Sequence, residues 1–123
     1  MNYKITFSED YFMGVTSGDA TVEGFRDLLN AIFEHENWES DKSLVSDHSD
    51  LNVSKITADD VRRIAQTAAE LRSKFRVTKH AVIAPRNLEY GLSRMWLAYI
   101  GEENKVTSRI FRSREEAIAW IST

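Results

Sequence analysis

The chain has 123 residues, with no cysteine and one proline, a net charge of −3 and an apolar fraction of 42%. This length suits one domain whose core needs no disulfide, and the lack of cysteine excludes thiol catalysis and cysteine metal sites. The negative charge disfavours nucleic-acid binding. There is no secretory pattern and no apolar run near the roughly 18 residues of a membrane helix, so we expect a cytoplasmic protein without a transmembrane segment.

The first half of the chain predicts a hairpin, a helix and a strand. Residues 3–7 and 11–17 are apolar strand segments joined by a short polar turn. A helix is predicted to begin after Thr21, a residue that caps helices well, because apolar residues then recur at helical spacing. A short strand is expected at 43–47, followed by a loop at 48–56.

The second half predicts three helices that alternate with two strands. Residues 57–60 resemble a capping box for a long helix, with Asp60 in place of the usual Glu. The basic residues at 72–80 suit the end of that helix, because its dipole favours cations there. Consecutive apolar residues at 79–84 indicate a central strand covered on both faces. Further predictions are a helix from Asn87, as its cap, to Gly101, a strand at 105–111, a capping box at 113–116, and a last helix that buries Ala117, Trp120 and Ile121.

The predicted order is β-β-α-β-α-β-α-β-α in a single domain spanning 1–123. Strands that alternate with helices of crossover length indicate an α/β sandwich with a mixed, largely parallel sheet. The opening hairpin should make one edge antiparallel.

Several phrases of the sequence resemble the SpoIIAA-like proteins, a mostly bacterial branch of the STAS and SEC14-like group. They are the opening hairpin, "TADDVRRIA" at 57–65, "GLSRM" at 91–95 and "RIFRSREEAIAW" at 109–120. The resemblance covers nearly the whole chain. It implies a mixed sheet with helices, usually no enzymatic activity, and the binding of a protein partner or a small or lipid-like ligand.

The resemblance also raises the question of a phosphorylated serine. In STAS switch proteins, a partner kinase modifies a serine at the start of the helix that follows a central strand. Ser46, Ser49 and Ser54 are candidates here, and Ser49 fits best by position. The chain departs from the switch pattern, because a phosphate on Ser49 would lie between Asp47 and Asp50, whose charges oppose it.

The segment 85–87, Pro-Arg-Asn, is a candidate anion site. It follows the carboxyl end of a predicted strand, where α/β proteins bind ligands, and Arg86 lies beside the backbone N–H groups of a helix start. Tyr90 and Arg94 are four residues apart and share a helix face. The simpler interpretation is that Asn87 caps the helix, Pro85 fixes the turn and Arg86 is solvated.

The sequence gives little support to catalysis or metal binding. His35, His48 and His80 lack metal-ligand spacing, and His80 is expected at an edge or half-buried strand position. Ser93 lies within a predicted helix and lacks the second glycine of a nucleophile elbow. The remaining catalytic alternative is a small hydrolase or transferase that uses residues 47–49, Asp-His-Ser. It requires His48 and Ser49 to converge with Arg86 in one closed pocket.

The predicted helix at 87–101 is apolar around most of its surface. Such a helix is either deeply covered or meets a partner. Core packing is the default, and a homodimer face or an apolar ligand groove lined by Met95, Trp96 and Tyr99 is the sharper hypothesis.

We therefore expect a non-catalytic binding or regulatory domain without a cofactor or metal. Its partner would be a protein, a second copy of the chain, or a small apolar or anionic, lipid-like ligand. The candidate binding residues are Arg86, Asn87, Tyr90, Arg94, Asp47 and Ser49, and the candidate interface residues are Met95, Trp96 and Tyr99.

Overall fold

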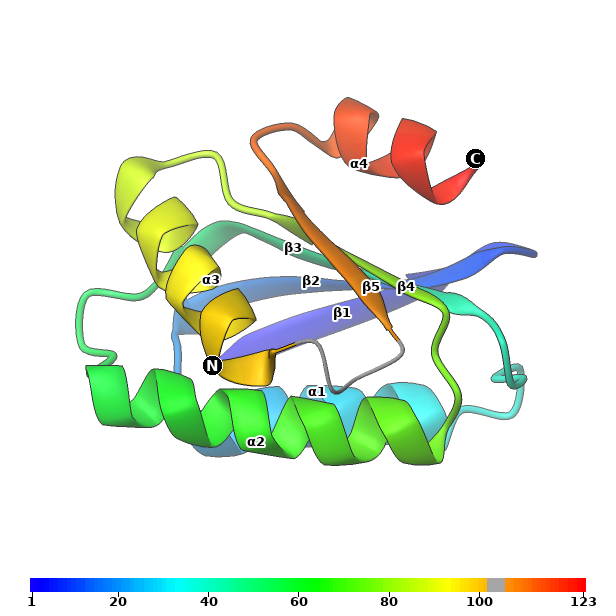
Figure 1. Cartoon of the computed structure of the whole chain (residues 1–123), viewed down its shortest axis with the longest axis horizontal. Coiled ribbons are helices and arrows are strands. Elements are labelled where there is room, and N and C mark those ends of the chain that lie inside the picture. The colour runs from blue at the N-terminus through cyan, green and yellow to red at the C-terminus, as the bar shows by residue number, and fades with distance from the viewer. Residues whose placement is uncertain (102–105) are drawn as a thin grey trace.

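The computed structural model describes residues 1–101 and 106–123. Strands and helices follow one another in the predicted order (Figure 1). Their bounds are β1 (Asn2–Phe7), β2 (Tyr11–Asp19), α1 (Val22–Phe33), β3 (Ser43–Asn52), α2 (Ala58–Lys74), β4 (Lys79–Ile83), α3 (Asn87–Ile100), β5 (Thr107–Phe111) and α4 (Arg114–Ile121). Lys105, where the last strand was predicted to begin, lies outside the described residues.

The five strands form one sheet in the order β1-β2-β3-β4-β5. β1 and β2 pair antiparallel, and the other neighbours pair parallel, which confirms the predicted mixed sheet with one antiparallel edge. β4 is an inner strand between β3 and β5, as its apolar sequence indicated, although β3 holds the central position.

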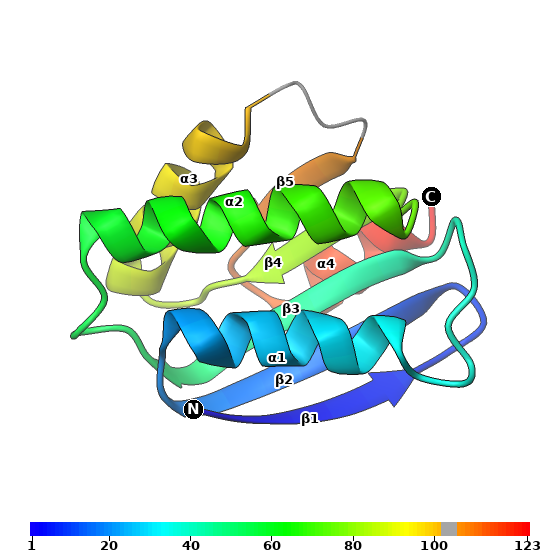
Figure 2. The same cartoon turned by 90° about the horizontal axis from the view of Figure 1, so that it is seen from below.

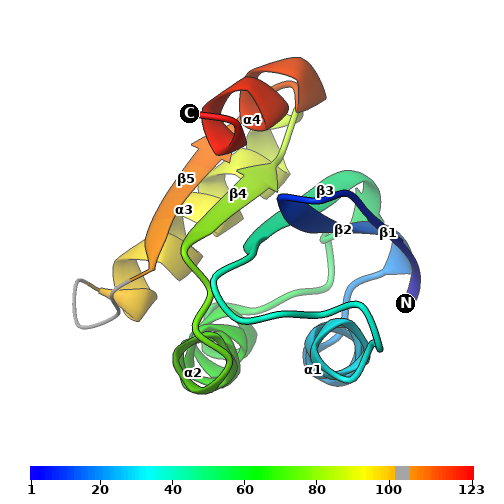
Figure 3. The ribbon, with the colours of Figure 1, turned by 90° about the vertical axis from the view of Figure 1, so that its right-hand side faces the viewer.

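Helices cover both faces of the sheet unequally. α1, α2 and α3 pack on one face and α4 packs on the other (Figures 2 and 3). Alternation along β4 divides its side chains between the two layers. Val82 belongs to the three-helix side, whereas Ala81 and Ile83 belong to the α4 side. No helix among the described residues combines the length and the apolar character needed to cross a bilayer.

β3 is longer than predicted, because it continues through residues expected to form a loop. It pairs with β2 from Ser43 to Asn52, with a register shift opposite Val15 and Ser17. Polar, turn-forming residues at the start of the segment 48–56 suggested a loop, but pairing with a buried neighbouring strand overrides this local preference.

The helix starts follow the sequence signals in three cases and depart from them in one. At α1, Thr21 accepts from the Gly24 N–H, as predicted. Thr57 and Asp60 form a complete, reciprocal capping box at α2. At α4, Ser113 accepts the expected bond from the Glu116 N–H, but among the described residues the reciprocal bond of the predicted capping box is not formed. At α3 the N-cap position is Arg86, without a side-chain bond, so the prediction that Asn87 is the cap is wrong.

Candidate functional site

A cavity of about 90 Å³ lies between the sheet and the helices α1, α2 and α3 that cover one of its faces. We call it the helix-side cavity. Its wall is mostly apolar and includes Phe25 and Leu28 from α1, Ile64 and Ala68 from α2, and Leu92 and Trp96 from α3. The polar side chains in the wall are Ser46, His48, His80, Glu89 and Ser93. An engineered apolar cavity of about 150 Å³ holds benzene, so this smaller space suits a small group or the buried end of a larger molecule.

His80 on β4 belongs to a buried hydrogen-bond chain that reaches the helix-side cavity. Its Nε2 lies 2.8 Å from Oγ of Ser46, and its Nδ1 lies 3.1 Å from Nη1 of Arg72. The same Nη1 donates to Oγ of Ser108 at 2.7 Å. Because a guanidinium only donates, Nδ1 of His80 must accept, and its proton resides on Nε2. That proton is donated to Ser46, whose own hydroxyl proton remains free to bond within the cavity.

Arg72 is fully buried, which the basic character of 72–80 did not indicate. Its guanidinium carbon lies 5.4 Å from the Trp96 ring centroid, and no carboxylate pairs with it among the described residues. Its Nε and Nη2 are buried without hydrogen-bond partners there. Burial lowers the pKa of Arg72 to about 10, so it stays charged at neutral pH. Burial first, and then the charge of Arg72, hold the pKa of His80 well below 6.5.

Ser46 and His80 have the spacing of a nucleophile and its base but the wrong protonation. A histidine base must present an unprotonated nitrogen to the serine hydroxyl. Arg72 fixes the opposite tautomer, in which the nitrogen facing Ser46 carries the proton. In this geometry His80 acts as a donor to Ser46 and cannot remove its proton.

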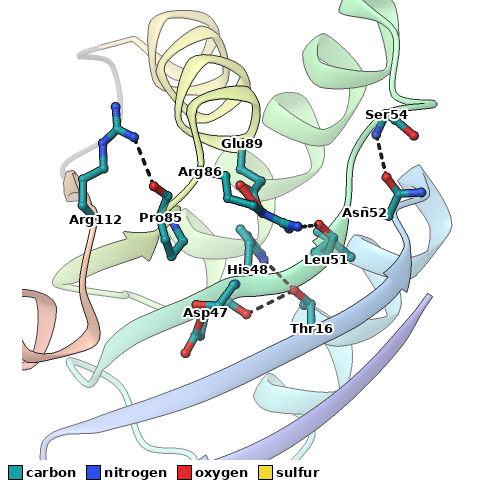
Figure 4. Close-up of polar contacts among 11 residues, drawn as sticks. Thr16, Asp47, His48, Leu51, Asn52, Ser54, Pro85, Arg86, Glu89 and Arg112 are labelled. Atoms are coloured by element: carbon teal, nitrogen blue, oxygen red, sulfur yellow. Dashed lines mark hydrogen bonds and ion pairs between the residues drawn. The ribbon is translucent and has the colours of Figure 1, made fainter.

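His48 on β3 presents a hydrogen-bond acceptor to the helix-side cavity. Its Nδ1 lies 2.7 Å from Oγ1 of Thr16, which donates its only proton to the backbone carbonyl of Asp47 (Figure 4). Nδ1 must therefore be the donor, and Nε2 is left as an unprotonated acceptor without a partner in the described part of the chain. Burial lowers the pKa of His48 to about 4, against the opposing charge of Asp47.

Glu89, in the first turn of α3, is the buried carboxylate of the cavity wall. Its side chain is 2% exposed. One oxygen, Oε1, accepts from Arg86, and Nη2 of Arg86 also donates to the carbonyl of Leu51 at 2.7 Å (Figure 4). The other oxygen, Oε2, is buried and has no hydrogen-bond partner among residues 1–101 and 106–123.

The residues of the predicted anion site do not form one cluster. Arg86 uses two of its nitrogens on Glu89 and on β3. Arg112, which sequence reasoning missed, donates to Oδ1 of Asn87 at 2.8 Å and lies 4.1 Å from the Tyr90 ring centroid. Arg94 is exposed on the outer side of α3.

Asp47 and Ser49 lie on the α4 side of the sheet rather than in the cavity wall. Oδ1 of Asp47 accepts from the Ser49 hydroxyl at 2.5 Å, and Oδ2 accepts from Nη2 of Arg114 at 2.6 Å. Burial alone would raise the pKa of Asp47, but the bonds from Ser49 and Arg114 outweigh burial and lower it. His48 points to the other face, so His48 and Ser49 do not converge with Arg86, and the catalytic grouping at 47–49 is not formed.

The three predicted interface residues divide between inside and outside. Trp96 is buried and lines the helix-side cavity, whereas Met95 and Tyr99 are 36% and 48% exposed. A homodimer face on α3 stays a prediction.

Most of the polar network comes from residues that sequence reasoning did not single out. Thr16, Arg72 and Glu89 lie on three elements far apart in the chain. One signal was available for Arg72, because it extends the buried series Val61, Ala65 and Ala68 at helical spacing. His80 was expected at an edge or half-buried position, which is wrong, since it is 4% exposed on an inner strand.

Comparison with known proteins identifies the fold. No family model matches the sequence, and no curated protein matches it. Among solved structures, the chain is similar to the crystal structure of an uncharacterized protein of the DUF3478 family with a SpoIIAA-like fold, from Shewanella loihica PV-4. The TM-score is 0.59 and the sequence identity 17%, over 98% of this chain and 92% of that one. The wider STAS and SEC14-like grouping stays a prediction. The chain has a SpoIIAA-like fold, as its sequence phrases predicted.

Proposed function

We propose that this protein is a non-catalytic binding domain that holds a small, mainly apolar molecule in the helix-side cavity. The observation that carries the proposal is the cavity itself, an apolar space with a few polar groups whose hydrogen bonds are incomplete. Small-molecule sites in proteins have this composition, because apolar walls supply affinity and a few polar groups fix orientation. Close-packed cores leave few such spaces by chance.

The charges around the cavity support an apolar ligand over an anionic one. Glu89 would repel an anion, and both histidines of the wall are neutral at pH 7 because burial lowers their pKa. Arg86, the expected anion ligand, already pairs with Glu89.

Two features support a binding role over the catalytic alternative. The tautomer of His80 prevents it from activating Ser46, and Ser49 is held by Asp47 on the other side of the sheet. A nucleophile, its base and an anion-stabilising group must share one site, and these residues do not.

A protein partner is the second candidate function. Leu88, Met95 and Tyr99 are exposed large apolar residues of α3, at positions that share one helix face. Exposed apolar residues that cluster on one face are typical of interaction surfaces. The cavity ranks first because the buried, unpartnered carboxylate oxygen of Glu89 in its wall also requires an explanation.

Titration of the whole chain with ethylbenzene, followed by amide NMR shifts, tests the proposal. We expect shifts at residues of the cavity wall. Ala68→Leu should weaken binding by at least about tenfold, because the larger side chain fills the space that the ligand needs. Ala98→Leu is the matched control, because Ala98 is an exposed position of α3 and the change should leave binding intact. The absence of shifts in the unmodified protein, or equal binding by Ala68→Leu, would contradict the proposal.

A further inference from the structure

We infer that the ligand of the helix-side cavity carries a neutral hydroxyl group, as an alcohol or a phenol does, and that this group donates its one proton to Glu89, with His48 as a second acceptor in the same wall. This inference, which rests on the function proposed above, names the chemical class of the molecule.

The first step is the unsatisfied oxygen of Glu89. Oε2 is buried in the wall of the cavity and lacks a partner in the described residues, although the side chain is only 2% exposed. A buried carboxylate oxygen without a hydrogen bond is costly, and few such groups occur in folded proteins. A donor on a bound molecule would satisfy it.

The second step is that His48 presents the same polarity from the opposite wall. Its Nδ1 donates to Thr16, so Nε2 can only accept. Oε2 of Glu89 on α3 and Nε2 of His48 on β3 are therefore both hydrogen-bond acceptors in the wall of one cavity. Neither atom accepts a hydrogen bond from the described part of the chain. Ser46 adds a hydroxyl that could donate to the oxygen of the same group.

The third step is that the donor should be neutral. Arg86 already balances the charge of Glu89 at Oε1. The guanidinium of Arg72 lies behind the cavity wall, where it donates to the wall residue His80. It has no carboxylate partner among the described residues. A further buried cation would meet this charge in an apolar space, where desolvation is expensive. A hydroxyl satisfies Oε2 of Glu89 without adding charge.

Calorimetric titration of the whole chain with three matched probes tests the inference. Ethylbenzene, benzyl alcohol and benzylammonium have the same number of heavy atoms and differ in the terminal group. We expect benzyl alcohol to bind more tightly than either of the others. In Glu89→Met, the ratio of benzyl alcohol to ethylbenzene affinity should fall about tenfold, which is the size of a hydrogen bond to a charged group. Glu89→Gln keeps an acceptor oxygen and should retain part of the preference.

The outcomes separate this inference from the proposed function. If ethylbenzene binds and the affinity ratio is the same in the unmodified protein and in both Glu89 variants, the hydroxyl assignment is wrong while the apolar site stands. If benzylammonium binds most tightly, the neutral group is wrong. If no probe binds, the proposed function fails with the inference. Circular dichroism checks that each variant folds. If Glu89→Met does not fold, Glu89→Gln alone is compared with the unmodified protein.

Discussion

Two buried histidines line the helix-side cavity, and their partners assign them different tautomers. Arg72 can only donate, so His80 accepts at Nδ1 and donates from Nε2. Thr16 donates its hydroxyl proton to a backbone carbonyl, so His48 donates from Nδ1 and accepts at Nε2. What these two side chains offer to the cavity is thereby set by hydrogen-bond direction rather than by charge.

The neutral state of His48 predicts a pH-dependent stability. Its pKa falls from an ordinary 6.5 to about 4 on folding, so the unfolded chain binds a proton between these values that the folded chain does not. The contribution of His48 is therefore present above pH 6.5 and is lost as the pH falls toward 4, by at most roughly 3 kcal/mol. His48→Asn keeps a donor for Thr16 and should reduce this pH dependence.

Urea denaturation at a series of pH values measures the effect. The difference in unfolding free energy between the unmodified protein and His48→Asn should be constant above pH 7 and should change below pH 6.5. A constant difference down to pH 4 would show that His48 keeps an ordinary pKa in the folded protein.

The tautomer of His80 predicts that Ser46 is not a reactive serine. A fluorophosphonate probe modifies serines whose proton is taken by a neighbouring base, and His80 cannot take it in this arrangement. We expect the mass of this protein to stay unchanged after incubation with the probe at pH 7. A known serine hydrolase in the same tube is the positive control and should be labelled. If the probe labels the unmodified protein but not Ser46→Ala, the tautomer assignment is wrong and an enzymatic function is supported instead.

The cavity and the neighbouring segment 47–49 show which residue roles could be predicted from the sequence. Asp47, His48 and Ser49 are neighbours in the chain, which suggested a joint role. In a strand, however, adjacent side chains point to opposite faces, so His48 enters the cavity while Asp47 faces α4. The grouping failed because the segment was expected to be a loop. The acceptor role of Glu89 was not predictable, since it depends on contacts between α3 and β3.

At the scale of elements, helix starts were predictable where a side chain caps the backbone locally. Thr57 and Ser113 each accept from the N–H three residues later, as their sequences indicated. The end of α3 at Gly101 also follows, because its φ of 66° is accessible to glycine at little cost. The start of α3 did not follow, because Asn87 bonds to Arg112, just after β5, instead of capping its own helix.

The two capping motifs predict different responses to substitution. At α2 the side chain of Asp60 accepts from the Thr57 N–H at 3.0 Å, so the box is reciprocal. At α4 the structure gives only the bond from the Glu116 N–H to Ser113. Asp60→Ala should therefore lower the unfolding free energy measurably, and Glu116→Ala by clearly less.

Urea denaturation of both variants and of Thr57→Ala checks this prediction. Thr57→Ala and Asp60→Ala remove bonds of one motif, so their effects should not be additive in the double variant. Equal losses for Asp60→Ala and Glu116→Ala would mean that the reciprocal bond adds nothing to the stability of α2.

At the scale of the whole molecule, the alternation of strands and helices was sufficient to predict the sheet and its antiparallel edge. The cavity was not predictable, because its wall combines side chains from α1, α2, α3, β3 and β4. The division of helices into three on one face and one on the other also depends on packing. It leaves α4, eight residues long, as the cover of a whole layer that includes Val45 and Phe111.

The ion pair between Asp47 and Arg114 joins α4 to the centre of the sheet. Asp47 is 3% exposed and its carboxylate accepts bonds on both oxygens, so an amide at this position cannot satisfy the same partners. Asp47→Asn should lower the unfolding free energy by about 2 kcal/mol at pH 7. Asp59→Asn is the matched control, because its pair with Arg62 is exposed and should contribute far less to stability.

The pH dependence distinguishes a lost charge from a general packing defect. The bonds from Ser49 and Arg114 lower the pKa of Asp47 below its ordinary 3.8, so the carboxylate stabilises the fold above that value. This contribution is lost as the pH falls through the lowered pKa. The difference between the unmodified protein and Asp47→Asn, measured by urea denaturation, should therefore be full at pH 7 and should narrow below pH 4. A difference that is the same at both would assign the effect to packing of α4 rather than to the ion pair.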